Sequence, residues 1–470
     1  MNYDFVVIGG GSAGYAAAAT AGKLGLKVAI IEGGQSVGGL CILRGCMPSK
    51  TLIESANRFL TLRRSSEFGL KADAIAFDAV EIQNRKRRLV GEFADYRRRQ
   101  LEMGGFDFVR GWATFRDAHT VEVAGDEHRT ISAKTFLIAT GSKLTHIDIP
   151  GCDETCFLDS DAVLDSEHIP KSVIVLGAGA TGLEFAHFYS GLGSDVTVLQ
   201  RGSQVLKEMD GDVAGALTEA FRRRGIRMFL GTMIRRIEKT PTGKRVHFGH
   251  EGEERSVEAE EIIYALGRSP QLDGLGLENA GIDAQHGHVT TGATQQTNVD
   301  HVFAAGDAAG PYEIVHLAIQ QGELAARNAA RLVRKKLEPL ETIDYRLRLF
   351  VIFTEPQVAS VGFTEKELLP TGAEYRTAQY PFSDHGKSMV IGETDGFVKL
   401  IAGQADGEIL GAAVVGPHAS ELIHEIAVAM HFHATVQDLA AVPHYHPTLS
   451  EIWTYPAEEL ALSGEPNMPL

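Results

Sequence analysis

The sequence is poor in cysteine and in basic charge, and both shortages limit what the protein can be. Its 470 residues include only four cysteines, too few for the disulfide framework of a small secreted scaffold. Acidic residues outnumber basic ones by 61 to 45, which gives a formal net charge of −16. This balance disfavours general attraction to nucleic acid or to anionic membranes. Because cysteine is so scarce, a closely spaced cysteine pair invites a chemical interpretation.

Long apolar segments are also lacking. The uncharged stretch 5–22 contains five glycines and follows Asp4, so it fits neither a membrane-spanning helix nor a secretory signal peptide. Hydrophobic residues at 44% and charged residues at 23% are typical of a globular protein, and the length predicts about three domains. We therefore expect a cytoplasmic protein, in which a retained disulfide would be catalytic rather than structural.

Glycine, in contrast, is abundant, and two glycine loops belong to one internal repeat. The apolar run 5–8 predicts a buried strand, which is followed by a glycine loop, an alanine-rich helix and a second strand that ends at Glu32. The same pattern returns 168 residues later, with Gln200 at the position of Glu32. The corresponding loop glycines are Gly9, Gly11 and Gly14 in the first copy and Gly177, Gly179 and Gly182 in the second.

Each loop has the spacing G-x-G-x-x-G, which by itself is a weak indication. Here each loop follows a strand and opens a helix. The first glycine can then form the tight turn, the second can let a pyrophosphate approach, and the third can pack the helix against the strand. The N-terminus of the helix faces the anion. The repeat therefore predicts an α/β fold with two Rossmann-like dinucleotide-binding domains.

The remaining segments predict the domain boundaries. Pro150 and Gly151 lie just before the second repeat, and 302–307 is again an apolar strand followed by glycine and an acid. Further along, strands at 350–362 and 397–415 alternate with turn residues before an apolar helix at 420–433, which predicts a C-terminal α+β domain. We therefore expect a first dinucleotide-binding domain at 1–150 and a second one at 151–275. A return segment of the first domain follows at 276–345, and the C-terminal domain occupies 346–470.

Cys41 and Cys46 are the most informative pair in the sequence. In a regular α-helix, Cα atoms five residues apart are about 8.6 Å from each other, beyond the reach of a disulfide. If the two sulfurs meet, the backbone must depart from a regular helix, and Gly45 and Pro48 supply the means. Two cysteines at this spacing are often ordinary buried residues. Their position after a glycine pair in a dinucleotide-binding unit favours a redox disulfide.

With these motifs in order, the sequence resembles the FAD-dependent pyridine nucleotide-disulfide oxidoreductases, the family of dihydrolipoamide dehydrogenase, glutathione reductase and mercuric reductase. The resemblance covers essentially the whole chain. Its motifs are the two glycine loops, Cys41 and Cys46 with 48–50, 139–142, Glu184, 267–270, 305–307 and 446–451.

The resemblance implies a role for each matching residue. Cys46 would rest as a thiolate beside the flavin, and Cys41 would attack the substrate disulfide. His446, held by Glu451, would be the acid/base. It would come from the partner subunit, so the C-terminal domain would be a dimerisation domain. Lys50 would lie near the flavin, paired with Glu184. The residues expected at FAD are Gly9, Gly11, Ser12, Ala13, Gly14, Glu32, Gly39, Lys50, Ala113, Thr140, Gly141 and Asp307. Those expected at the nicotinamide nucleotide are Gly177, Gly179, Thr181, Gly182, Gln200, Arg201, Lys207, Gly267 and Arg268. No metal is implied.

The residues after the second repeat bear on the choice of nucleotide. NAD-selective relatives carry an acid at position 200, where this chain has the neutral Gln200. NADPH-using relatives place basic residues where Arg201 and Lys207 stand. We therefore expect NADPH to be preferred to NADH, the alternative being that both cations are merely solvated.

The substrate motifs are mixed and leave several functions open. We expect an NAD(P)H:disulfide oxidoreductase similar to dihydrolipoamide dehydrogenase, acting as a homodimer on a small-molecule or lipoyl disulfide. The alternatives are an NADPH-dependent reductase similar to glutathione reductase and, in a different class, a redox-sensing flavoprotein. Mercuric reductases need a second cysteine pair near the C-terminus. No cysteine follows Cys156, so this function is less favoured. The sequence does not choose the physiological disulfide or indicate membership of a multienzyme complex.

Two further features have modest interpretations. Cys152 and Cys156 could form a second redox or metal pair, but only two candidate ligands lie together and structural zinc usually needs four. The basic runs 85–88 and 97–99 could recruit an anionic substrate, although we prefer a solvated helix face on a chain of this charge.

Overall fold

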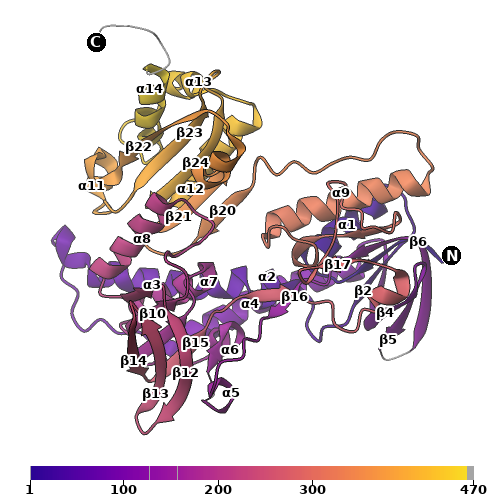
Figure 1. The fold of residues 1–470 in the computed structure, drawn as a ribbon, viewed down its shortest axis with the longest axis horizontal. Coiled ribbons are helices and arrows are strands. Elements are labelled where there is room, and N and C mark those ends of the chain that lie inside the picture. The colour runs from indigo at the N-terminus through magenta and orange to yellow at the C-terminus, as the bar shows by residue number, and fades with distance from the viewer. Residues whose placement is uncertain (1, 126–127, 156, 463–470) are drawn as a thin grey trace. The chain divides into compact units, whose positions relative to one another are not determined.

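The structure is a computed structural model that describes residues 2–125, 128–155 and 157–462 (Figure 1). The chain divides into two compact units, each built from three segments. Unit 1 comprises Met1–Thr51, Asn84–His146 and Gly267–Asp344. Unit 2 comprises Leu52–Gln83, Ile147–Leu266 and Tyr345–Leu470.

Unit 1 is built around a seven-stranded sheet in which most residues of the parallel strands are buried. Apolar runs of this kind are typical of strands that are covered on both faces. The parallel strands are, in spatial order, β3 (Asp107–Arg110), β2 (Val28–Glu32), β1 (Tyr3–Ile8), β6 (Arg129–Ile138) and β19 (Val302–Ala304). Antiparallel β5 (Thr120–Ala124) and β4 (Trp112–Asp117) extend the sheet from the first half of β6.

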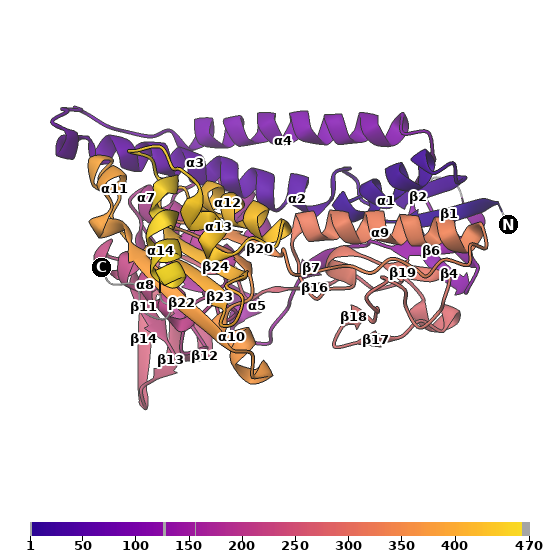
Figure 2. The same ribbon diagram turned by 90° about the horizontal axis from the view of Figure 1, so that it is seen from above.

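Two helices lie side by side on this sheet, α1 (Ser12–Lys23) and α9 (Val315–Val333) (Figures 1 and 2). Buried alanines and Gly322 allow them to approach closely, because a Cβ at Gly322 would lie 2.3 Å from the carbonyl oxygen of Ala13. The cysteine motif follows β2 in two helices, α2 (Gly39–Leu43) and α3 (Cys46–Arg63). Helix α4 (Ala79–Glu102), like α3, contributes residues to both units.

Unit 2 contains the second copy of the repeat. Its five-stranded parallel sheet has the order β11 (Arg227–Leu230), β10 (Asp195–Gln200), β9 (Ser172–Leu176), β15 (Glu261–Tyr264) and β8 (Leu158–Asp159). Helices α5 (Cys152–Thr155), α6 (Ser160–Asp165), α7 (Ala180–Gly191) and α8 (Gly211–Arg223) accompany it, with the antiparallel meander β12 (Met233–Thr240), β13 (Gly243–His250) and β14 (Glu253–Ala259). Both ends of α7 lie 168 residues after those of α1, so the predicted repeat is confirmed.

The C-terminal part of unit 2 is a five-stranded antiparallel sheet with helices packed on it. The strands are β20 (Leu349–Ile352), β21 (Gln357–Gly362), β24 (Ile409–Gly416), β23 (Phe397–Gly403) and β22 (Tyr375–Pro381). The helices are α10 (Glu365–Leu368), α11 (Gly386–Val390), α12 (Ala419–His431), α13 (Val436–Ala441) and α14 (Thr454–Leu462). The predicted α/β class is confirmed. Among the residues that the structure describes, no helix is both long and apolar enough to cross a membrane.

Short elements complete the two units. Strands β7 (Ser142–Leu144) and β16 (Arg268–Pro270) pair in unit 1, as do β17 (Ala284–Gln285) and β18 (His288–Val289). The 3-10 helices that matter below are η3 (Gly306–Ala308), η5 (Phe382–Asp384) and η6 (Ser450–Trp453).

Candidate active site

The first glycine loop joins β1 to α1 with the geometry that the sequence predicts. Gly9 has φ +108°, a conformation that favours glycine. A Cβ at Gly14 would lie 1.9 Å from the carbonyl oxygen of Gly9, so only glycine lets the helix pack against the turn. At the end of β2, Glu32 accepts hydrogen bonds from the backbone N–H groups of Gly10 and Gly34, at 2.8 and 2.7 Å. The carboxylate is therefore fixed beside the loop.

The second loop repeats these contacts in unit 2. Gly177 has φ +97°, and a Cβ at Gly182 would lie 2.1 Å from the Gly177 carbonyl oxygen. Gln200 occupies the place of Glu32, and its side-chain oxygen accepts a hydrogen bond from the N–H of Ala178 at 3.0 Å. The neutral amide thus makes the same loop contact as the carboxylate does in unit 1. Thr181, in the first turn of α7, is exposed.

Two basic residues follow Gln200 as the sequence indicates. Arg201 and Lys207 are both exposed, and the Lys207 ammonium lies 3.2 Å from the Glu208 carboxylate. An exposed ion pair of this kind is weak. Both cations can therefore reorient toward a ligand.

The surroundings of the first loop fit a bound dinucleotide such as FAD. Gly39 lies directly on Gly11, because a Cβ at Gly39 would be 2.5 Å from the Cα of Gly11. Such bare backbone suits a pyrophosphate, with the N-terminus of α1 at Ser12 and Ala13 beside it. The Thr140 hydroxyl is buried without a hydrogen-bond partner among the described residues, so it can receive a polar group of a ligand. Gly141 follows with φ +72°, and Ala113 lies on β4.

Asp307 belongs to a small polar cluster in unit 1. The Ser142 hydroxyl donates to Asp307 Oδ2 at 2.7 Å, and Arg268 donates to the Ser142 hydroxyl and carbonyl, both at 3.0 Å. Gly267 and Arg268 were both expected at the nicotinamide nucleotide. The structure instead links Arg268, through Ser142, to the aspartate expected at FAD.

The cysteine motif interrupts a helix, as the spacing predicts. Helix α2 ends at Leu43, and α3 begins at Cys46. Gly45 stands at the break, where a Cβ would lie 3.0 Å from the carbonyl oxygen of Leu40. Pro48 lies in the first turn of α3, where its missing N–H is tolerated, and its ring prevents a continuous helix that would include the Arg44 carbonyl.

Cys41 and Cys46 are half-buried and form a hydrogen-bonded pair of thiols. The hydrogen bond that the Cys41 thiol donates to Cys46 is the largest cause that raises the pKa of Cys41, and burial and the charge of Cys46 add to it. The Lys50 ammonium acts in the opposite direction. Two adjacent thiols cannot both ionise easily, so the pair holds one negative charge at a time.

His446 and Glu451 lie together in unit 2. The Nδ1 atom of His446 is 3.0 Å from Glu451 Oε2, and the histidine side chain is 79% exposed while the glutamate is buried. His444 is turned away, since its Nε2 pairs with Glu425 at 2.6 Å. His446 is therefore the histidine of this segment that is both oriented by a carboxylate and accessible.

The structure also shows a histidine that the sequence analysis missed. His385, at the N-terminus of α11, is fully buried, and its Nε2 lies 3.3 Å from Glu451 Oε1. No motif in the sequence links position 385 to position 451. Only the packing of η5 and α11 near η6 brings the two together.

Lys50 and Glu184 belong to different units. Lys50 lies on α3 in unit 1, and its charge acts on Cys41. Glu184 is buried on α7 in unit 2, where it accepts a hydrogen bond from the backbone N–H of Phe353 at 3.1 Å. Their pairing stays a prediction.

The second basic run is not the solvated face that we expected. Arg98 and Arg99 are exposed, but Arg97 is half-buried with its guanidinium 4.1 Å from the centre of the Tyr15 ring. Its Nε and Nη1 are buried without partners among the described residues. Desolvation lowers the pKa of Arg97, and the charge of Cys41 opposes that shift. A half-buried cation therefore interacts with Cys41. In the first run, Lys86 is also buried.

The other two cysteines do not form a recognisable site. Cys152 is buried, and Cys156 lies outside the described residues. Within the described part of the chain, no cluster of three or more histidine, cysteine, aspartate or glutamate residues could hold a metal ion.

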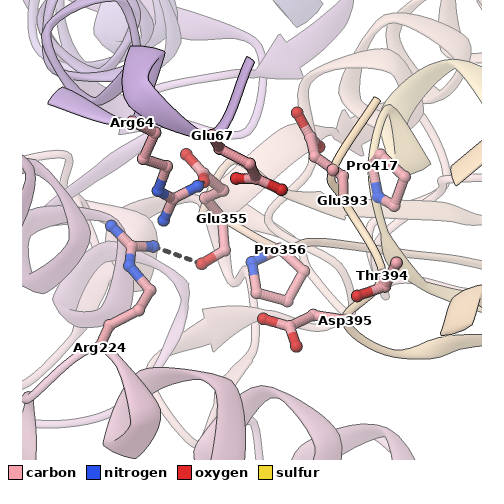
Figure 3. A pocket seen from close by; sticks show the side chains of 10 residues that line it. Arg64, Glu67, Arg224, Glu355, Pro356, Glu393, Thr394, Asp395 and Pro417 are labelled. Atoms are coloured by element: carbon pink, nitrogen blue, oxygen red, sulfur yellow. Dashed lines mark hydrogen bonds and ion pairs between the residues drawn. The ribbon is translucent and has the colours of Figure 1, made fainter. Parts of the chain in front are cut away.

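A polar pocket in unit 2 is separate from all of these residues (Figure 3). It has a volume of about 220 Å³, and Arg224 donates to the carbonyl oxygen of Glu355 at its wall. Burial lowers the pKa of Arg224. Its lining residues are Arg64, Glu67, Arg224, Glu355, Pro356, Gly392, Glu393, Thr394, Asp395 and Pro417. None of them is a predicted site residue.

Comparisons with known proteins agree over nearly the whole chain. Residues 3–322 match the family described as pyridine nucleotide-disulphide oxidoreductase, and 350–457 match its dimerisation domain. The chain is 33% identical to a dihydrolipoyl dehydrogenase of Geobacillus stearothermophilus, covering 90% of this chain and 88% of that protein. It is 35% identical to a mercuric reductase of Bacillus cereus, covering 90% of this chain and 66% of that protein.

Solved structures are similar along their full length. LpdA from Mycobacterium tuberculosis has a TM-score of 0.87 at 29% identity, covering 97% of this chain and 99% of that one. The HOCl-induced flavoprotein disulfide reductase RclA from Escherichia coli has a TM-score of 0.83 at 26% identity, with the same coverage.

Proposed function

The chain belongs to the FAD-dependent pyridine nucleotide-disulphide oxidoreductases, and on that premise we propose that it uses NADPH to reduce a low-molecular-weight or lipoyl disulfide through Cys41 and Cys46. The observation that carries the proposal is the interacting thiol pair at the helix break, in the same unit as the first glycine loop. Bound FAD supplies the two-electron transfer between the nicotinamide and this pair.

Each residue then has a defined part in the exchange. His446 takes the proton of the Cys41 thiol as Cys41 attacks one sulfur of the substrate disulfide, and the other sulfur leaves as a thiol by taking that proton back from His446. The Cys46 thiolate next attacks Cys41, which releases the second substrate sulfur as a thiolate that solvent protonates and restores the Cys41–Cys46 disulfide. Two electrons from NADPH open that disulfide again. Lys50 favours the negative charge on the pair throughout.

We propose that the enzyme is a homodimer in which His446 acts on the cysteines of the partner subunit. The C-terminal segment matches a dimerisation domain, and large apolar side chains of that segment, such as Phe432 and Tyr445, are exposed in the single chain. Pairing with a second copy would bury them.

The preference for NADPH rests on charge near Gln200. A carboxylate there would repel a 2′-phosphate, whereas an amide does not. Arg201 and Lys207 are exposed cations that can donate charge-assisted hydrogen bonds, each worth about 1.5 to 3 kcal/mol.

We expect the purified protein to oxidise NADPH in the presence of a disulfide and to release two thiols per NADPH. Steady-state rates with lipoamide, glutathione disulfide and coenzyme A disulfide would rank the substrates. The value of kcat/KM should be at least about ten-fold higher with NADPH than with NADH. Nucleotide oxidation without thiol release would contradict the proposed function, and a preference for NADH would contradict only the cofactor assignment.

Arg97 favours a second candidate function, the reduction of a charged disulfide similar to glutathione disulfide. Its charge interacts with Cys41 and two of its nitrogens have no partner among the described residues, so the guanidinium can attract an anionic group on a substrate that reaches Cys41. We expect Arg97→Gln to lower kcat/KM for glutathione disulfide by about 10- to 100-fold. The rate with neutral lipoamide should change far less.

Arg99→Gln is the matched control, because Arg99 is exposed two positions along the same helix. An equal loss with both substrates would show that Arg97 has a structural role and would remove the support for a charged disulfide.

A further inference from the structure

The carboxylate of Glu451 lies between two imidazoles, of which the proposed mechanism uses only one. Its Oε2 is 3.0 Å from Nδ1 of His446, and its Oε1 is 3.3 Å from Nε2 of His385. The His446 side chain is 79% exposed, whereas His385 has no exposed surface. The buried carboxylate therefore connects an accessible imidazole to one that no substrate can touch.

Ser388 indicates how the buried ring is protonated. Its hydroxyl lies 2.8 Å from Nδ1 of His385, and both side chains are fully buried. Burial lowers the pKa of His385, and Glu451 only partly opposes this, so the ring is neutral near pH 7. A neutral imidazole has one N–H, and the serine hydroxyl can donate to the other nitrogen. We assign the proton to Nε2, where it faces the carboxylate.

Glu451 is the natural acceptor for this proton. Nε2 of His385 has no well-aligned hydrogen-bond partner among the described residues, and the contact with Oε1 is oblique. A buried N–H with no other acceptor is costly. Its interaction with the carboxylate is therefore electrostatic, and a small rotation of either group would align it.

The aromatic rings that pack against His385 carry no charge. The rings of Phe382 and Tyr455 pack edge-on, each with its centre 6.4 Å from the centre of the imidazole ring. Tyr380 stacks on Tyr455 and donates to the Asp384 carboxylate, and burial raises the pKa of Tyr380 to about 12. The charged groups that act on His385 are Glu451 and, when protonated, His446.

We propose that His385 is a positioning residue for His446. It acts by holding Oε1 of Glu451 and by sharing the negative charge of that carboxylate. The inference rests on the proposed function, in which His446 gives a proton to the leaving thiol. A carboxylate that faces two N–H groups attracts the proton of either one less strongly than a carboxylate with a single partner. Sharing therefore weakens the stabilisation that Glu451 gives to the protonated His446 ring, which must release the proton on its other nitrogen in every turnover.

The test is the pH dependence of kcat/KM for the disulfide in three variants. In His385→Leu, Glu451 acts on His446 alone, so the alkaline limb of the profile should move to higher pH by about one unit. In His385→Gln, the amide nitrogen can occupy the place of Nε2 and donate without titrating, so the wild-type profile should return. His385→Asn keeps a polar group, but its amide reaches only the Nδ1 position, and it should behave like the leucine variant.

The Asn and Gln pair keeps the test decisive if the leucine variant does not fold. Profiles that overlay the wild-type curve in all three variants would overturn the proposal, and so would equal shifts in the Asn and Gln variants, which would indicate altered packing. Failure of the proposed function is distinguishable, because the wild-type enzyme itself would then show no disulfide turnover.

Discussion

Cys41→Ser is expected to abolish disulfide reduction, lowering kcat/KM by at least about 10³-fold. A serine hydroxyl cannot form the mixed disulfide that joins the enzyme to its substrate, and no other cysteine can take its place at this end of the pair. The variant should keep its FAD, because the glycine loop and the Thr140 region that fit the dinucleotide are unchanged. Release of thiols from the substrate, measured with a thiol reagent, is the appropriate assay.

Cys152→Ser is the control for that experiment. Cys152 is a buried thiol in unit 2 that the proposed exchange does not use, so turnover should be retained. A Cys41→Ser enzyme with more than about a tenth of wild-type disulfide turnover would refute the assignment of Cys41.

His446→Gln is expected to lower kcat/KM for the disulfide by about 10²- to 10⁴-fold, the usual range for loss of a general acid. Glutamine has no titratable group and cannot pass a proton to the leaving thiol. His444→Gln provides a matched control, since His444 is two residues away and is held by Glu425. That control should stay within a few-fold of the wild-type rate.

Mixing the two inactive enzymes tests whether the site is shared between subunits. If Cys41 of one subunit works with His446 of its partner, a hybrid of the Cys41→Ser and His446→Gln chains has one intact site. Equal mixing after dissociation should then restore about one quarter of the wild-type activity. If both residues come from the same chain, no activity returns.

Local features could be predicted because their causes are local. The glycine loops follow from the turn at Gly9 and the close approach at Gly14, and the second copy repeats both. The break between Cys41 and Cys46 follows from helix geometry. Strand β22 was missed, because only Ala378 of its seven residues is buried, which leaves little hydrophobic pattern.

Features that depend on distant segments were not predicted. By sequence, Arg97 belongs to a basic run that is expected to be exposed. In the structure its guanidinium packs on the Tyr15 ring, and its charge interacts with Cys41. His385 carries no motif at all and acquires its contact with Glu451 only when the C-terminal sheet and helices assemble. The bounds of the four predicted segments and the pairing of Lys50 with Glu184 stay predictions.

The sequence by itself determined the α/β class, the duplicated nucleotide loops and the residues of the cysteine and histidine motifs, because these depend on short-range geometry and on residue type. The tertiary structure alone decided which groups act on those residues: the second imidazole on Glu451 and the half-buried Arg97 guanidinium, whose charge interacts with Cys41. Burial and electrostatic interaction act through space, so the chain must fold before either can change the chemistry of a side chain.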